Sequence, residues 1–151
     1  MNTLDASNVS SLDPIALAQL QRRMHGELLT PDLDTYELAW RMHSQRFAGR
    51  PALIARCLTT HDVVLAIVFA RERKLTIAAS ARDPSEGAML FDLSQMRQIS
   101  IDPLQQIARV QSGATAEEFT QAATTYGLAG DTVLALEIVA LDGTIVTARA
   151  H

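Results

Sequence analysis

The chain has 151 residues, of which 48% are apolar and 20% are charged, as in an ordinary globular protein of one domain. Its formal net charge of −4 argues against nucleic acid as a partner, because proteins that bind nucleic acid present a basic stripe. A single cysteine, Cys57, excludes an internal disulfide, and its apolar neighbours favour a small buried hydrophobe over a nucleophile.

The N-terminal segment is polar. Residues 1–12 are rich in Ser and Asn, which predicts a disordered tail, and residues 13–151 are then expected to form a single unit. The segment lacks the basic-then-apolar order of a signal peptide. The longest strictly apolar run, VVLAIVFA, is much shorter than the roughly 20 residues that cross a bilayer. We therefore expect a cytoplasmic protein without a membrane partner.

Two helices are predicted before residue 50. The first begins at Asp13-Pro14, an Asp cap followed by proline at the first helical position, and stops at Gly26. The second lies around residues 32–43. Its Tyr36 and Trp40 are one turn apart and could stack on a planar ligand, but anchoring the helix on the core is the favoured interpretation.

The pattern changes from residue 50 onward. PALIARCL and LTIAAS are predicted strands, and TTHDVVLAIVFARERK between them is a helix with a threonine cap, an acid in its first turn and basic residues in its last. The spacing predicts one apolar stripe on this helix. Its members are Val63, Ile67 and Ala70, widened by Val64 and Val68.

The second half of the chain favours local pairing. FDL looks like the start of a strand, QISIDPLQQIARVQSG is predicted to be a hairpin, and ATAEEFTQAATTYGL a helix capped by Thr115. VLALEIVALDGTIVTARA predicts a hairpin with Asp142-Gly143 at its turn. Gly113, before the helix, could help to hold an anion, but a tight turn is the favoured interpretation. Strands that alternate with helices and also pair locally predict an α+β fold with a mixed sheet.

Three blocks in this order resemble one known family. RPALIARCLTTHDVVLAIVFARERKLTIA, FDLSQMRQISIDPLQQIARVQSGATAEEF and LALEIVALDGTIVTARA are together similar to the FAD-binding domain, of PCMH type, of the berberine-bridge-enzyme-like and vanillyl-alcohol-oxidase flavin oxidoreductases. The resemblance implies two small α/β subdomains with mixed sheets and FAD lying between them. We expect the substrate-binding domain of these enzymes to be lacking here.

The loop between residues 79 and 88 departs from the family pattern. Members follow the preceding strand with R-G-G-G-H, whose glycines let backbone N–H groups approach the FAD pyrophosphate. Here the corresponding residues are Ser80, Ala81, Arg82, Asp83 and Pro84. Side chains disfavour the positive-φ conformations that glycine supplies, proline removes a donor, and two acids add charge that repels a diphosphate. The family's Gly-rich flavin segment is also missing after the last helix. The sequence therefore predicts a shortened and degenerate flavin site.

If FAD is bound, the resemblance places its phosphates and adenine near particular residues. Ser80, Ala81, Arg82, Asp83, Pro84 and Gly113 would lie on the phosphate side, and Pro51, Ile138 and Val139 nearest the adenine. No residue is assigned a catalytic role. The four histidines do not pair at helical spacing, and no metal site is predicted.

Three hypotheses for function remain open. The first is a non-redox binding or interaction module that has lost the flavin site, and the loop favours it over an enzyme. The second is an FAD-dependent oxidoreductase, or a subunit of one, that binds FAD noncovalently. The third is a decayed fragment without a function of its own. Loss of the flavin and of a partner domain would uncover the apolar segment VLALEIVAL, so we expect a homodimer or a protein partner there, or a small planar ligand.

Overall fold

The fold is that of a computed structural model, which describes residues 12–45, 49–79, 86–127, 135–140 and 142–149. The side chains of residues 135, 136, 138, 148 and 149 lie outside this description. The chain divides into two compact units. Unit 1 comprises Met1–Asp92 and Val139–Thr144, and unit 2 comprises Leu93–Ile138 and Ile145–His151.

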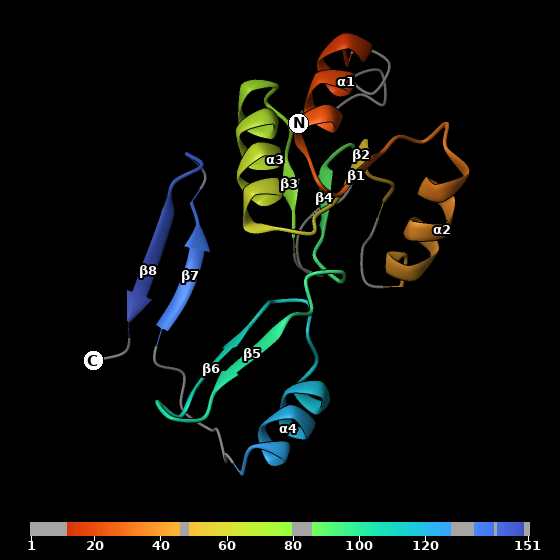
Figure 1. The fold of residues 1–151 in the computed structure, drawn as a ribbon. Helices are drawn as coiled ribbons and strands as arrows, with labels where there is room; N and C mark the ends of the chain where they lie inside the picture. Colours follow the sequence, from red (N-terminus) through yellow and green to blue (C-terminus); the bar gives the residue numbers. More distant parts are fainter. Residues whose placement is uncertain (1–11, 46–48, 80–85, 128–134, 141, 150–151) are drawn as a thin grey trace. The chain divides into compact units, whose positions relative to one another are not determined.

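Unit 1 is a four-stranded mixed sheet with helices (Figure 1). Strand order is β1-β2-β4-β3, in which β4 runs parallel to both β2 and β3, and β1 is antiparallel to β2. A mixed α+β arrangement was predicted and is confirmed. The elements are α1 (Pro14–Arg23), β1 (Glu27–Leu29), α2 (Asp34–His43), β2 (Leu53–Arg56), α3 (Thr60–Glu72), β3 (Ile77–Ala78) and β4 (Met89–Asp92).

Local capping starts two of these helices where the sequence predicts. Asp13 accepts a hydrogen bond from the Ile15 N–H at 3.0 Å, with proline in the first turn of α1. Thr59 caps α3 by accepting from the Asp62 N–H at 3.2 Å. Each cap satisfies a backbone donor that the helix itself leaves without a partner. A buried apolar cluster then joins α2 to the sheet. Its members are Leu29, Tyr36, Ala39, Trp40, Ile54, Ala78, Ala88 and Leu90.

The apolar stripe predicted on α3 is only partly buried. Ile67 and Ala70 are buried, but Val63, Val64 and Val68 are only half-buried. The helix is apolar around most of its circumference, so spacing alone does not show which side faces the core. The buried side chains of α3 are Asp62, Leu65, Ala66, Ile67, Phe69 and Ala70.

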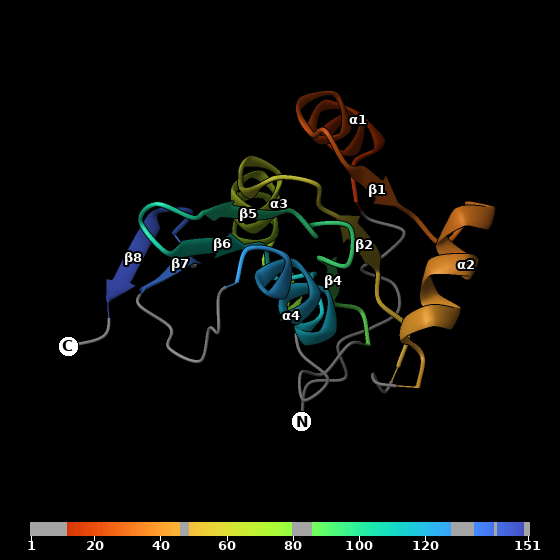
Figure 2. The same ribbon diagram turned by 60° about the horizontal axis from the view of Figure 1, so that its bottom comes forward.

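Unit 2 contains a hairpin, a helix and most of a second hairpin (Figure 2). Strands β5 (Ile99–Asp102) and β6 (Ile107–Val110) pair antiparallel, and α4 (Ala116–Thr125) contacts β5. Strands β7 (Ala135–Val139) and β8 (Ile145–Arg149) pair with each other around the predicted Asp142-Gly143 turn. Both predicted hairpins are therefore confirmed.

Several boundaries differ from the prediction. Strand β1 was not predicted, β4 begins at Met89 rather than at the FDL segment, and β3 has two residues where six were expected. The predicted tail lies almost wholly outside the described residues, as does the loop over residues 80–85. None of the helices in the described ranges has the length and apolar character needed to span a membrane.

Candidate functional site

The residues that the family resemblance places near FAD are distributed over both units. Ser80, Ala81, Arg82, Asp83 and Pro84 lie outside the described residues. Pro51, in unit 1, is fully buried, and its carbonyl accepts a hydrogen bond from the Tyr36 hydroxyl at 2.6 Å. Val139 is half-buried in β7, next to Ile138, whose side chain is not described, and Gly113 lies in unit 2. The structure thus leaves the assignment of these residues to FAD as a prediction.

Tyr36 and Trp40 form part of the core. Tyr36 is fully buried and Trp40 nearly so, which confirms that they anchor α2. Burial raises the pKa of Tyr36, although the Arg50 guanidinium above its ring opposes this shift. A planar ligand therefore cannot stack on these rings without opening the core of unit 1.

The C-terminal end of the 80–85 loop, at Glu86 and Gly87, is fastened to the segment before β2. The Gly87 N–H donates to the Arg50 carbonyl at 2.9 Å, and the Arg50 N–H donates to Glu86 Oε2 at 2.8 Å. Gly49 has a φ of +87°, and a Cβ there would lie 2.5 Å from Glu86 Oε2. Glycine at this position therefore gives the Glu86 carboxylate the room to reach the Arg50 N–H.

The Arg50 side chain is also engaged. Its guanidinium forms an ion pair with Glu37 and lies 5.5 Å from the centre of the Tyr36 ring. The acceptor of the Arg50 backbone N–H and the partner of its guanidinium are thus both carboxylates of the protein. This arrangement places negative charge beside the loop that corresponds to the flavin cradle.

Gly113 makes a close approach to the backbone within unit 2. Its N–H donates to the Met96 carbonyl at 2.8 Å, and a Cβ at this position would lie 2.1 Å from the Leu93 carbonyl oxygen. No side chain fits there without displacing main chain. This contact accounts for the glycine as part of a tight turn, which was the favoured interpretation.

The N-terminus of α4 has its own internal acceptors. The Glu118 N–H donates to Thr115 Oγ1 at 3.2 Å, and the Thr115 N–H donates to Glu118 Oε2 at 2.8 Å. This is a complete capping box, so two N-terminal donors are already satisfied. Arg97 pairs with the same Glu118 carboxylate.

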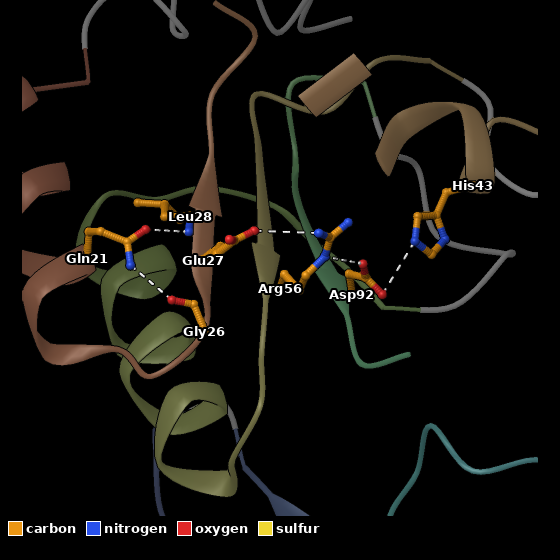
Figure 3. Close-up of polar contacts among 7 residues, drawn as sticks. All are labelled: Gln21, Gly26, Glu27, Leu28, His43, Arg56 and Asp92. Carbon is orange, nitrogen blue, oxygen red and sulfur yellow. Dashed lines mark hydrogen bonds and ion pairs between the residues drawn. The ribbon is translucent and has the colours of Figure 1, made fainter. Parts of the chain in front are cut away.

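A charged cluster lies where β2 and β4 end, which sequence reasoning missed (Figure 3). Arg56 and Asp92 are register partners at the carboxyl ends of these parallel strands, and Arg56 Nε lies 3.2 Å from Asp92 Oδ2. His43 Nε2, from the end of α2, is 3.4 Å from the other oxygen of Asp92, and Glu27 of β1 is 3.5 Å from Arg56 Nη1.

This cluster, Arg56–Asp92–His43 with Glu27, ties four elements together. Only 2% of the Asp92 side chain is exposed, and a buried carboxylate requires charged or hydrogen-bonded partners of this kind. Carboxyl ends of parallel strands are also the usual place for ligands in open α/β sheets. The sequence signal was present but weak: a charged residue ends each of two otherwise apolar strands.

A second buried carboxylate, Asp62, was interpreted from the sequence only as a favourable charge in the first turn of α3. Its oxygens accept hydrogen bonds from the N–H groups of His25 at 2.7 Å, Gly26 at 2.9 Å and Leu58 at 2.9 Å. Burial raises the pKa of Asp62, but the backbone hydrogen bonds outweigh this effect and the net shift is downward. Asp62 thus clamps the α1–β1 connection to the β2–α3 connection.

Gln21 reinforces the same connection. Its amide nitrogen donates to the Gly26 carbonyl at 2.9 Å, and its amide oxygen accepts from the Leu28 N–H at 2.7 Å (Figure 3). A Cβ at Gly26 would lie 1.9 Å from the Arg56 carbonyl oxygen, so the chain passes very close to β2 at this glycine.

Cys57 and the histidines carry no sign of metal or thiol chemistry in the described ranges. Cys57 is buried, and burial raises its pKa to about 12, with Asp62 and Asp92 adding to the shift. No group of three or more His, Cys, Asp or Glu side chains within those ranges could hold a metal ion. His25 and His61, which are far apart in sequence, meet edge to face with ring centres 6.4 Å apart.

Comparison with known proteins identifies the class to which this fold belongs. The solved structure of 6-hydroxy-D-nicotine oxidase from Arthrobacter nicotinovorans matches 83% of this chain and 36% of its own with a TM-score of 0.71 at 21% identity. A variant of berberine bridge enzyme matches 90% of this chain and 37% of its own, with a TM-score of 0.69 at 17% identity. The fold is therefore that of a PCMH-type FAD-binding domain.

Sequence similarity leads to the same enzymes. (R)-6-hydroxynicotine oxidase of Paenarthrobacter nicotinovorans is 29% identical over 116 residues, 72% of this chain and 25% of the relative. FAD-linked oxidoreductase hasG of Aspergillus fumigatus is 25% identical over 118 residues, 71% of this chain and 25% of the relative. No protein-family profile matches. The homologues and structural neighbours are thus FAD-linked oxidases of the berberine-bridge-enzyme-like group, and the chain spans about a quarter of the length of these curated relatives.

Proposed function

We propose that this chain is a non-redox relative of the FAD-binding domain, which has lost the flavin site and acts as a binding or interaction module. The observation that carries the proposal is the position of the Glu86 carboxylate. It accepts a hydrogen bond from the Arg50 N–H at 2.8 Å, directly after the 80–85 loop that corresponds to the flavin-binding loop of the family. The family resemblance implies that backbone N–H groups of this loop approach the FAD pyrophosphate. Here a carboxylate of the protein lies at the C-terminal end of that loop, held by the backbone N–H of Arg50.

The electrostatic consequence of Glu86 supports the proposal. A diphosphate near the Arg50 backbone would meet the Glu86 carboxylate, and two unit charges 4 Å apart repel by about 1 kcal/mol even in water. Asp83 adds a further acid within the loop, and Pro84 removes a backbone donor. The described residues at this junction therefore fit a dinucleotide poorly, and we derive no redox step for the chain. A cytoplasmic location belongs to the same proposal.

The alternative is an FAD-dependent oxidoreductase, or a subunit of one, with noncovalently bound FAD. The observation that favours it is the sequence similarity to (R)-6-hydroxynicotine oxidase and to an FAD-linked oxidoreductase, over more than 110 residues each. In this case Arg82 is the residue of the loop whose charge favours an anion. Bound FAD would supply hydride acceptance, and the chain would orient it.

A visible absorption spectrum separates the two functions. The purified chain is incubated with FAD and desalted, and its visible absorption spectrum is recorded to detect retained flavin. We expect no retained flavin. Retention of flavin near one equivalent would overturn the proposed function in favour of the oxidoreductase.

Two variants test the role assigned to Glu86. Glu86→Gln keeps the shape and removes the charge, so we expect weaker repulsion and a severalfold gain in affinity for ADP, a diphosphate that lacks the flavin. Glu117→Gln, at an exposed position in the first turn of α4, is the matched control and should leave ADP affinity unchanged. Equal ADP affinity in both variants would remove the support that Glu86 gives.

A further inference from the structure

Helix α2 has an outer face that combines apolar and charged side chains. Tyr36, Ala39 and Trp40 face the core, and the opposite side of the helix carries Leu38 and Met42, whose exposed fractions are 62% and 69%. These two side chains are four residues apart and so lie next to each other on one face. Single exposed apolar residues are normal, but an adjacent pair of this size on a ten-residue helix is a candidate for contact.

Two opposite charges complete this face. Asp34 and Arg41 are four residues before and three residues after Leu38, so all three share one side of the helix. Both charged residues are exposed, and neither makes an ion pair with another residue that the structure describes. We define the α2 face as Asp34, Leu38, Arg41 and Met42.

We infer that the α2 face binds the α2 face of a second copy of this chain, with the two helices antiparallel about a two-fold axis. The charges on the α2 face are the reason for proposing a second copy of this chain as the partner. In an antiparallel pair centred between Glu37 and Leu38, Asp34 of one copy lies opposite Arg41 of the other, and the symmetry repeats this contact. The Leu38 side chains of the two copies then meet near the axis. The pattern is self-complementary, as a two-fold interface requires.

The antiparallel arrangement also follows from the order of the charges along α2. The acid lies near the N-terminus and the base near the C-terminus, about 10 Å apart at 1.5 Å per residue. A parallel pair would place Asp34 against Asp34 and Arg41 against Arg41, and like charges across an interface disfavour association. Only the antiparallel pair joins opposite charges at both ends.

The expected dimer is weak. Ten helical residues extend about 15 Å, so the contact area falls below that of a standard stable interface. We therefore expect a dissociation constant on the order of 100 µM, and association that grows between about 10 and 500 µM. This inference concerns unit 1 alone and does not depend on whether FAD binds.

Sedimentation velocity of the full chain over this concentration range tests the inference. The wild type should pass from monomer to dimer, and Leu38→Glu should weaken association about tenfold or more because it places two carboxylates near the axis. Ile15→Glu is the matched control, since Ile15 on α1 is 68% exposed but lies outside the α2 face. This control should dimerise as the wild type does.

A mixing experiment tests the charge pairs and the antiparallel register directly. Asp34→Lys alone and Arg41→Glu alone each create two repulsive pairs in their homodimers, so each variant should associate several times more weakly than the wild type. In the mixed dimer both pairs are again opposite in sign. An equimolar mixture should therefore regain association close to that of the wild type. Circular dichroism confirms that each variant is folded.

Three results would overturn the inference. A wild type that stays monomeric up to about 500 µM excludes the dimer at the proposed strength. A dimer that Leu38→Glu and Ile15→Glu affect equally lies on another face. A mixture of the two charge variants that associates no better than either alone excludes the antiparallel pairing.

Discussion

Replacement of Asp62 gives the sharpest test of how unit 1 is held together. Its carboxylate is completely buried and accepts hydrogen bonds from three backbone N–H groups. Two of these groups belong to the α1–β1 connection and one to the β2–α3 connection. We predict that Asp62 stabilises the fold as a clamp between these connections. A conventional acid in the first turn of a helix would contribute only through the helix dipole.

The magnitude follows from the hydrogen bonds. Asp62→Ala leaves three backbone donors without their acceptor, at about 1 kcal/mol or more each, so the free energy of unfolding should fall by about 3 kcal/mol or more. Asp62→Asn keeps one oxygen and turns an N–H group toward a backbone donor. We expect Asp62→Asn to cost about 2 kcal/mol, less than Asp62→Ala.

The dependence on pH has a definite sign. Because hydrogen bonds to the charged form lower the pKa of Asp62 on folding, the carboxylate stabilises the fold above its unfolded pKa of about 3.9. That stabilisation is lost as the pH falls through the lower pKa of the folded protein. The difference in stability between the wild type and Asp62→Asn should therefore be full at pH 7, and should shrink below about pH 4.

Urea unfolding followed by circular dichroism, at pH 7 and in steps down to about pH 3, measures these differences. The control is Glu117→Gln in the first turn of α4, which loses only a dipole contribution of about 0.5 kcal/mol. Two outcomes would refute the clamp: an effect of Asp62→Asn no larger than that of the control, or a difference that stays constant down to the lowest pH.

Two further predictions concern single residues of unit 1. Lys74 follows Arg73, the C-cap of α3, and has a φ of +55°, which glycine adopts without strain. Lys74→Gly should therefore raise the free energy of unfolding by up to about 1 kcal/mol in the same urea assay. A loss of stability would show that the lysine side chain itself stabilises this helix end. Cys57 is buried with its pKa raised to about 12, so a thiol reagent at pH 8 (a condition about four units below that pKa) should label it only after denaturant is added. Rapid labelling of the folded protein would contradict the burial.

Elements with strong local signals were predicted well. Asp13-Pro14, Thr59 and Thr115 each start a helix through a side-chain cap, which depends only on neighbouring residues. The Asp142-Gly143 turn is local in the same way. Strand β1 was missed because three residues carry no usable period, and its position depends on pairing with β2, about 27 residues away along the chain.

The candidate site was harder to predict because its contacts join distant segments. Arg56 and Asp92 are 36 residues apart, and Asp62 reaches His25 over 37 residues. Their types are visible in the sequence, but their partners depend on the parallel pairing of β2 with β4. The sequence alone shows which residue types form the 80–85 loop. The hydrogen bond from the Arg50 N–H to Glu86 is seen only in the structure.

The order of strands in the sheet of unit 1 bears on how the protein avoids aggregation. The two edges are formed by β1 and β3, which have three and two residues, whereas the inner strands β2 and β4 have four each. Short edge strands expose few N–H and C=O groups to a neighbouring molecule, so they are poor templates for added strands. The apolar inner strands are thereby shielded from edge-to-edge polymerisation with a second molecule.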